Sequence, residues 1–169
     1  MEKKGDLIYW IFCAIFLIVL CLTYIFFSKN MNNLTPIHLI LFLFLPFILF
    51  FGIVCYFLNK LWETRNIEQL KLYKIIISYL FSVFFIVVFF AYIFATLAGF
   101  TNHGIKDGNK NLEGIFNYLY FSGLNFYSSA FGEATPLGLS RLFVLIELAL
   151  SSIIHVMVIS IIISKYIEK

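Results

Sequence analysis

Four long apolar runs set the strongest limit on what this chain can fold into. They cover Leu7–Phe27, Ile37–Leu58, Ile75–Leu97 and Leu139–Ser164. A helix needs about 20 predominantly apolar residues to cross the hydrocarbon core of a bilayer, and each run has that length. In lipid the backbone polar groups must be satisfied within the segment, so each run predicts a helix. The fold class expected is an all-α membrane protein with four transmembrane helices.

Composition excludes most soluble functions. Hydrophobic residues make up 62% of the chain and charged residues 12%, with a mean hydropathy of +0.97. A soluble domain of this length has no interior large enough to hide that much apolar surface. The net charge of +3 does not indicate a nucleic-acid partner. The partner that the composition predicts is therefore the lipid bilayer.

No residue pattern indicates an enzyme, a cofactor or a resident metal. The three cysteines, Cys13, Cys21 and Cys55, lie inside apolar runs and lack the spacing of metal ligands. Ser128 or Ser129 together with His155 resembles part of a hydrolase triad, but no acid orients the histidine. We therefore expect no catalytic residues.

The basic residues predict an orientation. Those on one side of the four spans are Lys3, Lys4, Lys60, Arg65, Lys71, Lys74, Lys165 and Lys169, and those on the other are Lys29, Lys106, Lys110 and Arg141. An excess of Lys and Arg marks the cytoplasmic side, so both termini are expected in the cytoplasm of a plasma-membrane protein.

The chain is expected to have two parts. Residues 1–74 contain two peripheral helices and a linker, and residues 75–169 contain the third and fourth apolar runs and the segment between them.

The segment between the third and fourth apolar runs is unusual. Gly99–Asn111 is rich in Gly and Asn and predicts an exposed turn. Leu112–Tyr127 is amphipathic and too short to span, which predicts a re-entrant or interfacial helix. The polar stretch YSSAFGEATP, Tyr127–Pro136, follows it and lies between two apolar segments.

Residues from Phe116 onward resemble the pore domain of the two-span potassium channel superfamily. Tyr120-Phe121-Ser122 matches the end of that family's pore helix, and Thr135-Pro136-Leu137-Gly138 matches the segment after its selectivity filter. The resemblance covers about Ile75–Lys169. It implies an outer helix, a pore helix, a filter loop and an inner helix, assembled as a homotetramer.

Aligned with the family's filter pattern TVGYGD, this chain has Ser128, Ser129, Ala130, Phe131, Gly132 and Glu133, which we call the filter segment. In such filters, rings of backbone carbonyls replace the hydration shell of the ion. Ala130 stands where the family has a glycine, and a left-handed backbone costs alanine about 1–2 kcal/mol. Phe131 lacks the tyrosine hydroxyl, and Glu133 retains an acid at the outer mouth.

The resemblance and these departures together predict a cation channel that passes K⁺ and/or Na⁺ with weak selectivity. These permeant ions are the only cofactors expected. The alternative is a non-conducting membrane module that binds a lipid or a protein partner through its first two helices.

Several residues outside the filter segment are candidates for supporting roles or for lining a pore. Glu147 is an acid within the fourth span, where acids are usually paired. It is expected either behind the filter segment, bonded to Ser122, Asn125 or Tyr127 as filter support, or exposed near the outer mouth. One stripe of the fourth span is expected to line the pore or form its gate. It contains Ser152, then either His155 or Val156, then Ile159 and Ile163. His155 either faces that cavity or bonds between helices.

Overall fold

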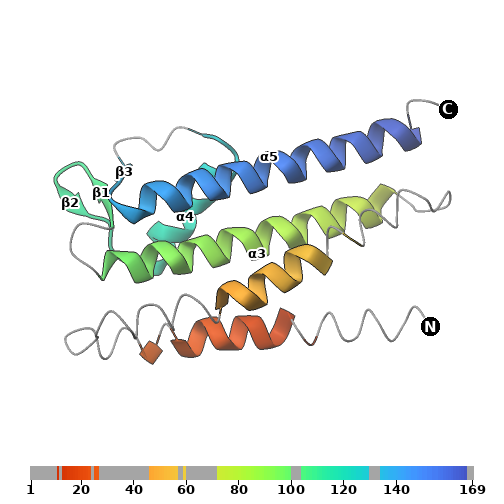
Figure 1. Ribbon diagram of the computed structural model, residues 1–169. Coiled ribbons are helices and arrows are strands. Elements are labelled where there is room, and N and C mark those ends of the chain that lie inside the picture. Colours follow the sequence, from red (N-terminus) through yellow and green to blue (C-terminus); the bar gives the residue numbers. More distant parts are fainter. Residues whose placement is uncertain are drawn as a thin grey trace. The chain divides into compact units, whose positions relative to one another are not determined.

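The computed structural model describes residues 11, 13–23, 25–26, 46–56, 59, 72–99, 104–129 and 134–166 (Figure 1). The chain divides into two compact units, Met1–Leu58 and Asn59–Lys169. Of the filter segment, Ser128 and Ser129 are described, and Ala130, Phe131, Gly132 and Glu133 lie outside the described residues.

The first unit contains two apolar helices, Cys13–Thr23 and Pro46–Tyr56. The ring centroids of Phe16 and Phe50 are 6.3 Å apart, and both side chains are buried. These helices lie within the first two predicted spans. Of the other residues of those spans, Ile11, Ile25 and Phe26 are described, and all three are helical. Full-length spans in this unit therefore stay a prediction.

The second unit is built on two long helices, α3 (Leu72–Ala98) and α5 (Leu139–Tyr166). Ile75–Ala98 and Leu139–Ser164 are long and apolar enough to cross a membrane. The helices predicted over the third and fourth apolar runs are therefore confirmed. The two helices contact each other and run in opposite directions, and the short helix α4 (Ile115–Phe126) packs against both (Figure 1).

A small antiparallel sheet connects the two ends of the segment between α3 and α5. Its strands are β1 (Ile105–Asp107), β2 (Lys110–Asn111) and β3 (Ala134–Pro136), in the order β2-β1-β3. The expectation of an all-α chain with an exposed turn over Gly99–Asn111 is therefore corrected. Strands of two or three residues are too short to show an alternating pattern, and the partner of β1 lies 27 or more residues further along the chain.

The sheet is fixed to the end of α3 by close backbone contact. A Cβ atom added to Gly104 would lie 3.2 Å from Cα of Ala98, which leaves room only for glycine without adjustment. The next residue, Ile105, is fully buried. The N–H of Leu137 donates to the carbonyl of Gly104 at 2.9 Å, which ties the segment just before α5 to the same point. The sheet therefore marks one end of the α3–α5 pair.

Replacing Ile105 by alanine should destabilise the second unit, because a buried side chain would be exchanged for a cavity at the junction of sheet and helix. The expected loss is about 2–4 kcal/mol, measured by unfolding of the detergent-solubilised protein. Lys110→Ala, on the exposed edge strand of the same sheet, is the control and should change stability little. Equal stability of the two variants would contradict the packing described.

Candidate functional site: the short helix α4 and its surroundings

Helix α4 extends from the sheet into the middle of the long helices. It starts shortly after β2 and spans 12 residues, roughly 18 Å at 1.5 Å per residue. At its other end, the rings of Phe126 and Tyr127 lie 5.2 and 6.0 Å from the ring of His155. His155 is 16 residues into α5, about 24 Å from the end where the sheet lies.

The chain then returns to the end from which it came. After Tyr127 the next described element on the way to α5 is β3, which pairs with β1 in the sheet. The described parts of the segment between α3 and α5 thus begin and end at one end of the helix pair (Figure 1), and among them Phe126 and Tyr127 reach the level of His155. A connecting loop on the surface would have no such depth.

The buried face of α4 has helical periodicity. Its buried residues are Tyr118, Phe121, Ser122, Asn125 and Phe126, the i, i+3, i+4, i+7, i+8 pattern of an amphipathic helix. Phe121 packs edge-to-face on Phe94 of α3, with centroids 5.3 Å apart. On the opposite face, Phe116 and Tyr120 are 81% and 70% exposed within this single chain. The helix is therefore fixed on one side and presents large aromatic rings on the other.

Glu147 of α5 is fully buried and bonds to two residues of α4. The hydroxyl of Ser122 donates to Oε1 of Glu147, and the amide Nδ2 of Asn125 donates to Oε2. The same amide group donates to the carbonyl of Val144 at 3.3 Å. The predicted hydrogen bonds from Ser122 and Asn125 are confirmed, and the alternative of an exposed Glu147 is wrong. Support of a filter by these bonds stays a prediction.

One atom of this cluster has no partner within the described part of the chain. Oδ1 of Asn125 is buried and accepts no hydrogen bond from any described residue. The third partner considered for Glu147, Tyr127, instead packs against His155, with ring centroids 6.0 Å apart.

The end of α4 is closed by a Schellman motif. Ser128 has φ of 53°, its N–H donates to the carbonyl of Asn125 at 2.9 Å, and the N–H of Ser129 donates to that of Leu124 at 2.8 Å. This pattern usually has glycine in the left-handed position. From the sequence, a left-handed backbone was expected at Ala130 and not at Ser128. Serine is not among the residues enriched in this conformation, so the sequence carried no signal for it.

His155 packs inside the chain among aromatic rings. Its ring lies 5.8 Å from that of Tyr79 on α3, besides its contacts with Phe126 and Tyr127. The side chain is half-buried. The predicted stripe has either His155 or Val156 at this turn. Val156 is the exposed one of the two, with 67% of its surface accessible.

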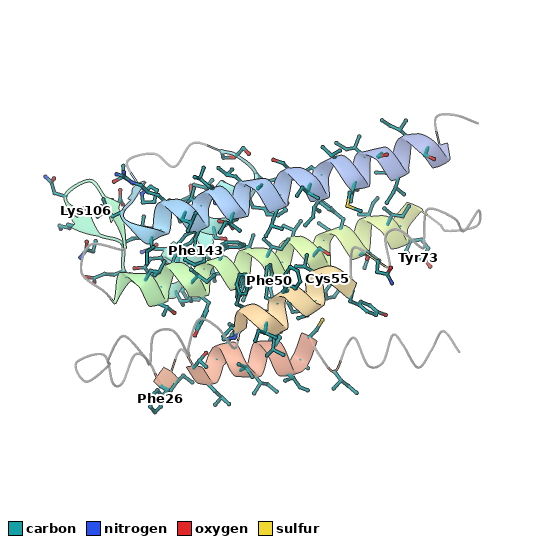
Figure 2. The ribbon with its side chains drawn as sticks, viewed as in Figure 1. Phe26, Phe50, Cys55, Tyr73, Lys106 and Phe143 are labelled. Atoms are coloured by element: carbon teal, nitrogen blue, oxygen red, sulfur yellow. The ribbon has the colours of Figure 1, made fainter. Side chains whose placement is uncertain are left out.

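An exposed stripe runs along α5 on the side away from its contacts with α3 and α4. Figure 2 shows side chains that project from α5 on this side. The members of the stripe are Leu145, Ala149, Ser152, Val156, Ile159 and Ile163. Their spacing of 4, 3, 4, 3 and 4 residues is that of a heptad seam, along which helices pack against one another.

Ser152 is the one polar member of this stripe, and its hydroxyl bonds within its own helix. It donates to the carbonyl of Leu148 at 2.9 Å, and Ser151 donates to the same carbonyl at 3.0 Å. Side-chain bonds of this kind compete for the carbonyl and often bend helices. The pair therefore marks the point of α5 where a bend costs least.

Comparisons of the chain with family models, with curated proteins and with solved structures find no match. Among the described residues, no three His, Cys, Asp or Glu side chains gather closely enough to hold a metal ion.

Replacing Glu147 by alanine should destabilise the second unit, because it leaves the hydroxyl of Ser122 and the amide of Asn125 buried and without their acceptor. The expected loss is about 2–5 kcal/mol, measured by thermal unfolding in detergent. Glu147→Gln has nearly the same volume and keeps one acceptor, so it should lose less. The exposed Glu113→Gln serves as a control for removal of one acid. If Glu147→Ala were as stable as this control, the cluster would not hold α4 to α5.

Proposed function

We propose that the chain forms a tetrameric cation channel in which the filter segment, Ser128–Glu133, conducts K⁺ and Na⁺ with weak selectivity. The observation that carries the proposal is the path of α4. A short helix enters from one end of two membrane-length helices, stops about half-way along them and is followed by a return to the same end. This is the geometry of a re-entrant loop. Irregular backbone at membrane depth is tolerated where it is buried in protein or lines a water-filled cavity.

The electrostatics of α4 favour a cation at its deep end. A helix carries a partial negative charge at its C-terminus. The C-terminus of α4 lies at the level of His155, near the middle of α5. A cation that loses its water at this depth would be stabilised by that charge.

Assembly around an axis follows from the need to surround an ion. One loop cannot encircle a cation, so several copies are required, and fourfold symmetry is the closed arrangement that the resemblance implies. The heptad-spaced stripe on α5 is an apolar surface suited to line the axis between copies. Ile159 and Ile163, at its inner end, would narrow the pore and act as a hydrophobic gate.

Weak selectivity is proposed from the sequence of the filter segment. Ala130 occupies the position where a glycine would reach the left-handed conformation at little cost. Phe131 has no hydroxyl to anchor the segment to surrounding helices. A ring of Glu133 would raise the cation concentration at the entrance and repel anions. With both termini in the cytoplasm, the sheet and this entrance lie on the outer side of the plasma membrane.

The decisive experiment reconstitutes the purified protein in liposomes and measures cation flux and reversal potential with K⁺ on one side and Na⁺ on the other. A current with a reversal potential near zero is expected. The double variant Ala130→Gly/Phe131→Tyr should raise preference for K⁺ about tenfold, equivalent to about 1.4 kcal/mol. Chloride replacement by a large anion is the control and should leave the current unchanged. No flux from folded tetramers, or a dimer in place of a tetramer, would support a non-conducting module instead.

A second experiment tests which face of α5 lines the pore. In a background without the three native cysteines, Val156→Cys and Ile159→Cys should be modified by a charged thiol reagent, with loss of most of the current. Val158→Cys is the matched control, because Val158 is buried within the chain. Its current should persist. Block of the Val158 variant with no effect on the other two would reverse the assignment of the pore face.

A further inference from the structure

Helix α5 holds α4 at two levels, and the deeper level is formed by His155. At the outer level, Glu147 accepts hydrogen bonds from Ser122 and Asn125. His155 lies eight residues further along α5, a distance of about 12 Å. Its ring centroid is 5.2 Å from that of Phe126, the last residue of α4. The two levels differ in kind, since the outer one is a hydrogen-bonded group and the deeper one consists of packed rings.

The ring of His155 also joins the end of α4 to α3. It lies 5.8 Å from the ring of Tyr79 on α3 and 6.0 Å from that of Tyr127, which caps the end of α4. The rings of Phe126 and Tyr127 pack edge-to-face on each other at 5.3 Å. These four side chains form an aromatic cluster, in which His155 contacts the other three. Aromatic rings at such separations attract each other beyond the area that they bury.

The aromatic cluster ends where the filter segment begins. Ser128, the first residue of that segment, follows Tyr127 and has a left-handed backbone with φ of 53°. Its N–H donates to the carbonyl of Asn125, and the N–H of Ser129 donates to that of Leu124, so hydrogen bonds fix the backbone from the last turn of α4 onward. A left-handed backbone is unfavourable for serine and persists where the surrounding structure holds it. The rings that directly precede Ser128 supply such support.

His155 acts in the aromatic cluster by packing and not by exposure to the proposed pore. Its side chain is half-buried, whereas the neighbouring Val156 is 67% exposed and belongs to the stripe proposed to line the axis. The ring neighbours of His155 are phenylalanine and tyrosine side chains, so the contacts are between aromatic rings. Loss of the His155 ring therefore removes contacts with the end of α4 and leaves the hydrogen bonds of Glu147 in place.

We propose that His155 is a positioning residue for conduction, which holds the end of α4 against α3 and thereby sets the position of Ser128 at the inner end of the filter segment. The inference rests on the proposed function. In the proposed channel, an ion at this end of the segment lies beside Ser128 and the negative end of α4. A displacement of either changes the coordination of the ion, since oxygen atoms must replace its hydration shell in direct contact.

The test measures single-channel conductance and reversal potential, with K⁺ on one side and Na⁺ on the other, for the full-length protein in planar bilayers. His155→Ala should shift the reversal potential and lower the conductance about fivefold, the factor that corresponds to loss of one aromatic contact. His155→Phe keeps a planar ring and should stay within about 1.5-fold of the unmodified protein. Val158→Ala is the matched control, because it removes a buried side chain from the next turn of α5, and its conductance should be unchanged.

A second measurement reports the position of Ser128 without any current. In a background without the three native cysteines, Ser128→Cys is treated with a charged thiol reagent in the folded, detergent-solubilised protein, and the rate of modification is measured. Ser128 is exposed, so the reagent can reach this position. His155→Ala should change the rate severalfold, whereas His155→Phe and Val158→Ala should leave it unchanged. Thermal unfolding of each variant verifies that the protein is folded.

The outcomes separate the two proposals. If His155→Ala leaves either the conductance or the modification rate unchanged, or if Val158→Ala alters both equally, the role of His155 is overturned and the channel stands. Equal losses in His155→Ala and His155→Phe also overturn it, because the ring nitrogens and not the packing of the ring would then be responsible. If the folded, unmodified protein carries no current, the proposed function fails, and the role of His155 in conduction fails with it.

Discussion

The buried carboxyl group of Glu147 is the interaction on which the arrangement of the second unit depends. It accepts hydrogen bonds from Ser122 and Asn125, which are one turn apart on the inner face of α4. An acid inside an apolar helix is costly unless its oxygens are satisfied, and these two donors satisfy one oxygen each. Because both donors belong to the same short helix, the cost of burying Glu147 is offset only when α4 lies at one position along α5.

The sheet holds the other end of the segment between α3 and α5. Glu147 holds the middle and end of α4, whereas the pairing of β1 with β3 holds the point to which the chain returns. Gly104 and Ile105 fix that point to the end of α3. The two ends of the stretch between α4 and β3 are therefore restrained by contacts with the long helices.

The exposed surfaces of the second unit suggest what surrounds it. The stripe on α5 and the aromatic rings of Phe116 and Tyr120 on α4 are apolar and uncovered within one chain. Large uncovered apolar surfaces occur in proteins that face lipid or partner molecules. The spacing of the stripe on α5 is that of a seam along which helices pack.

The sequence by itself was sufficient to predict the long helices over Ile75–Leu97 and Leu139–Ser164, because twenty consecutive apolar residues have few other ways to satisfy their backbone. It also predicted a short amphipathic helix before Tyr127 and, as one of two alternatives for Glu147, hydrogen bonds from Ser122 and Asn125, since a buried acid needs donors within reach. Only the tertiary structure decided the sheet, the left-handed Ser128 and the choice of Val156 over His155 for the exposed stripe. The sheet depends on residues far apart in the chain, and the exposed stripe depends on the rotation of one helix against its neighbours. The turn at Ser128 is local, but it has serine where glycine is usual. Local composition does not encode the three-dimensional contacts that select among such alternatives.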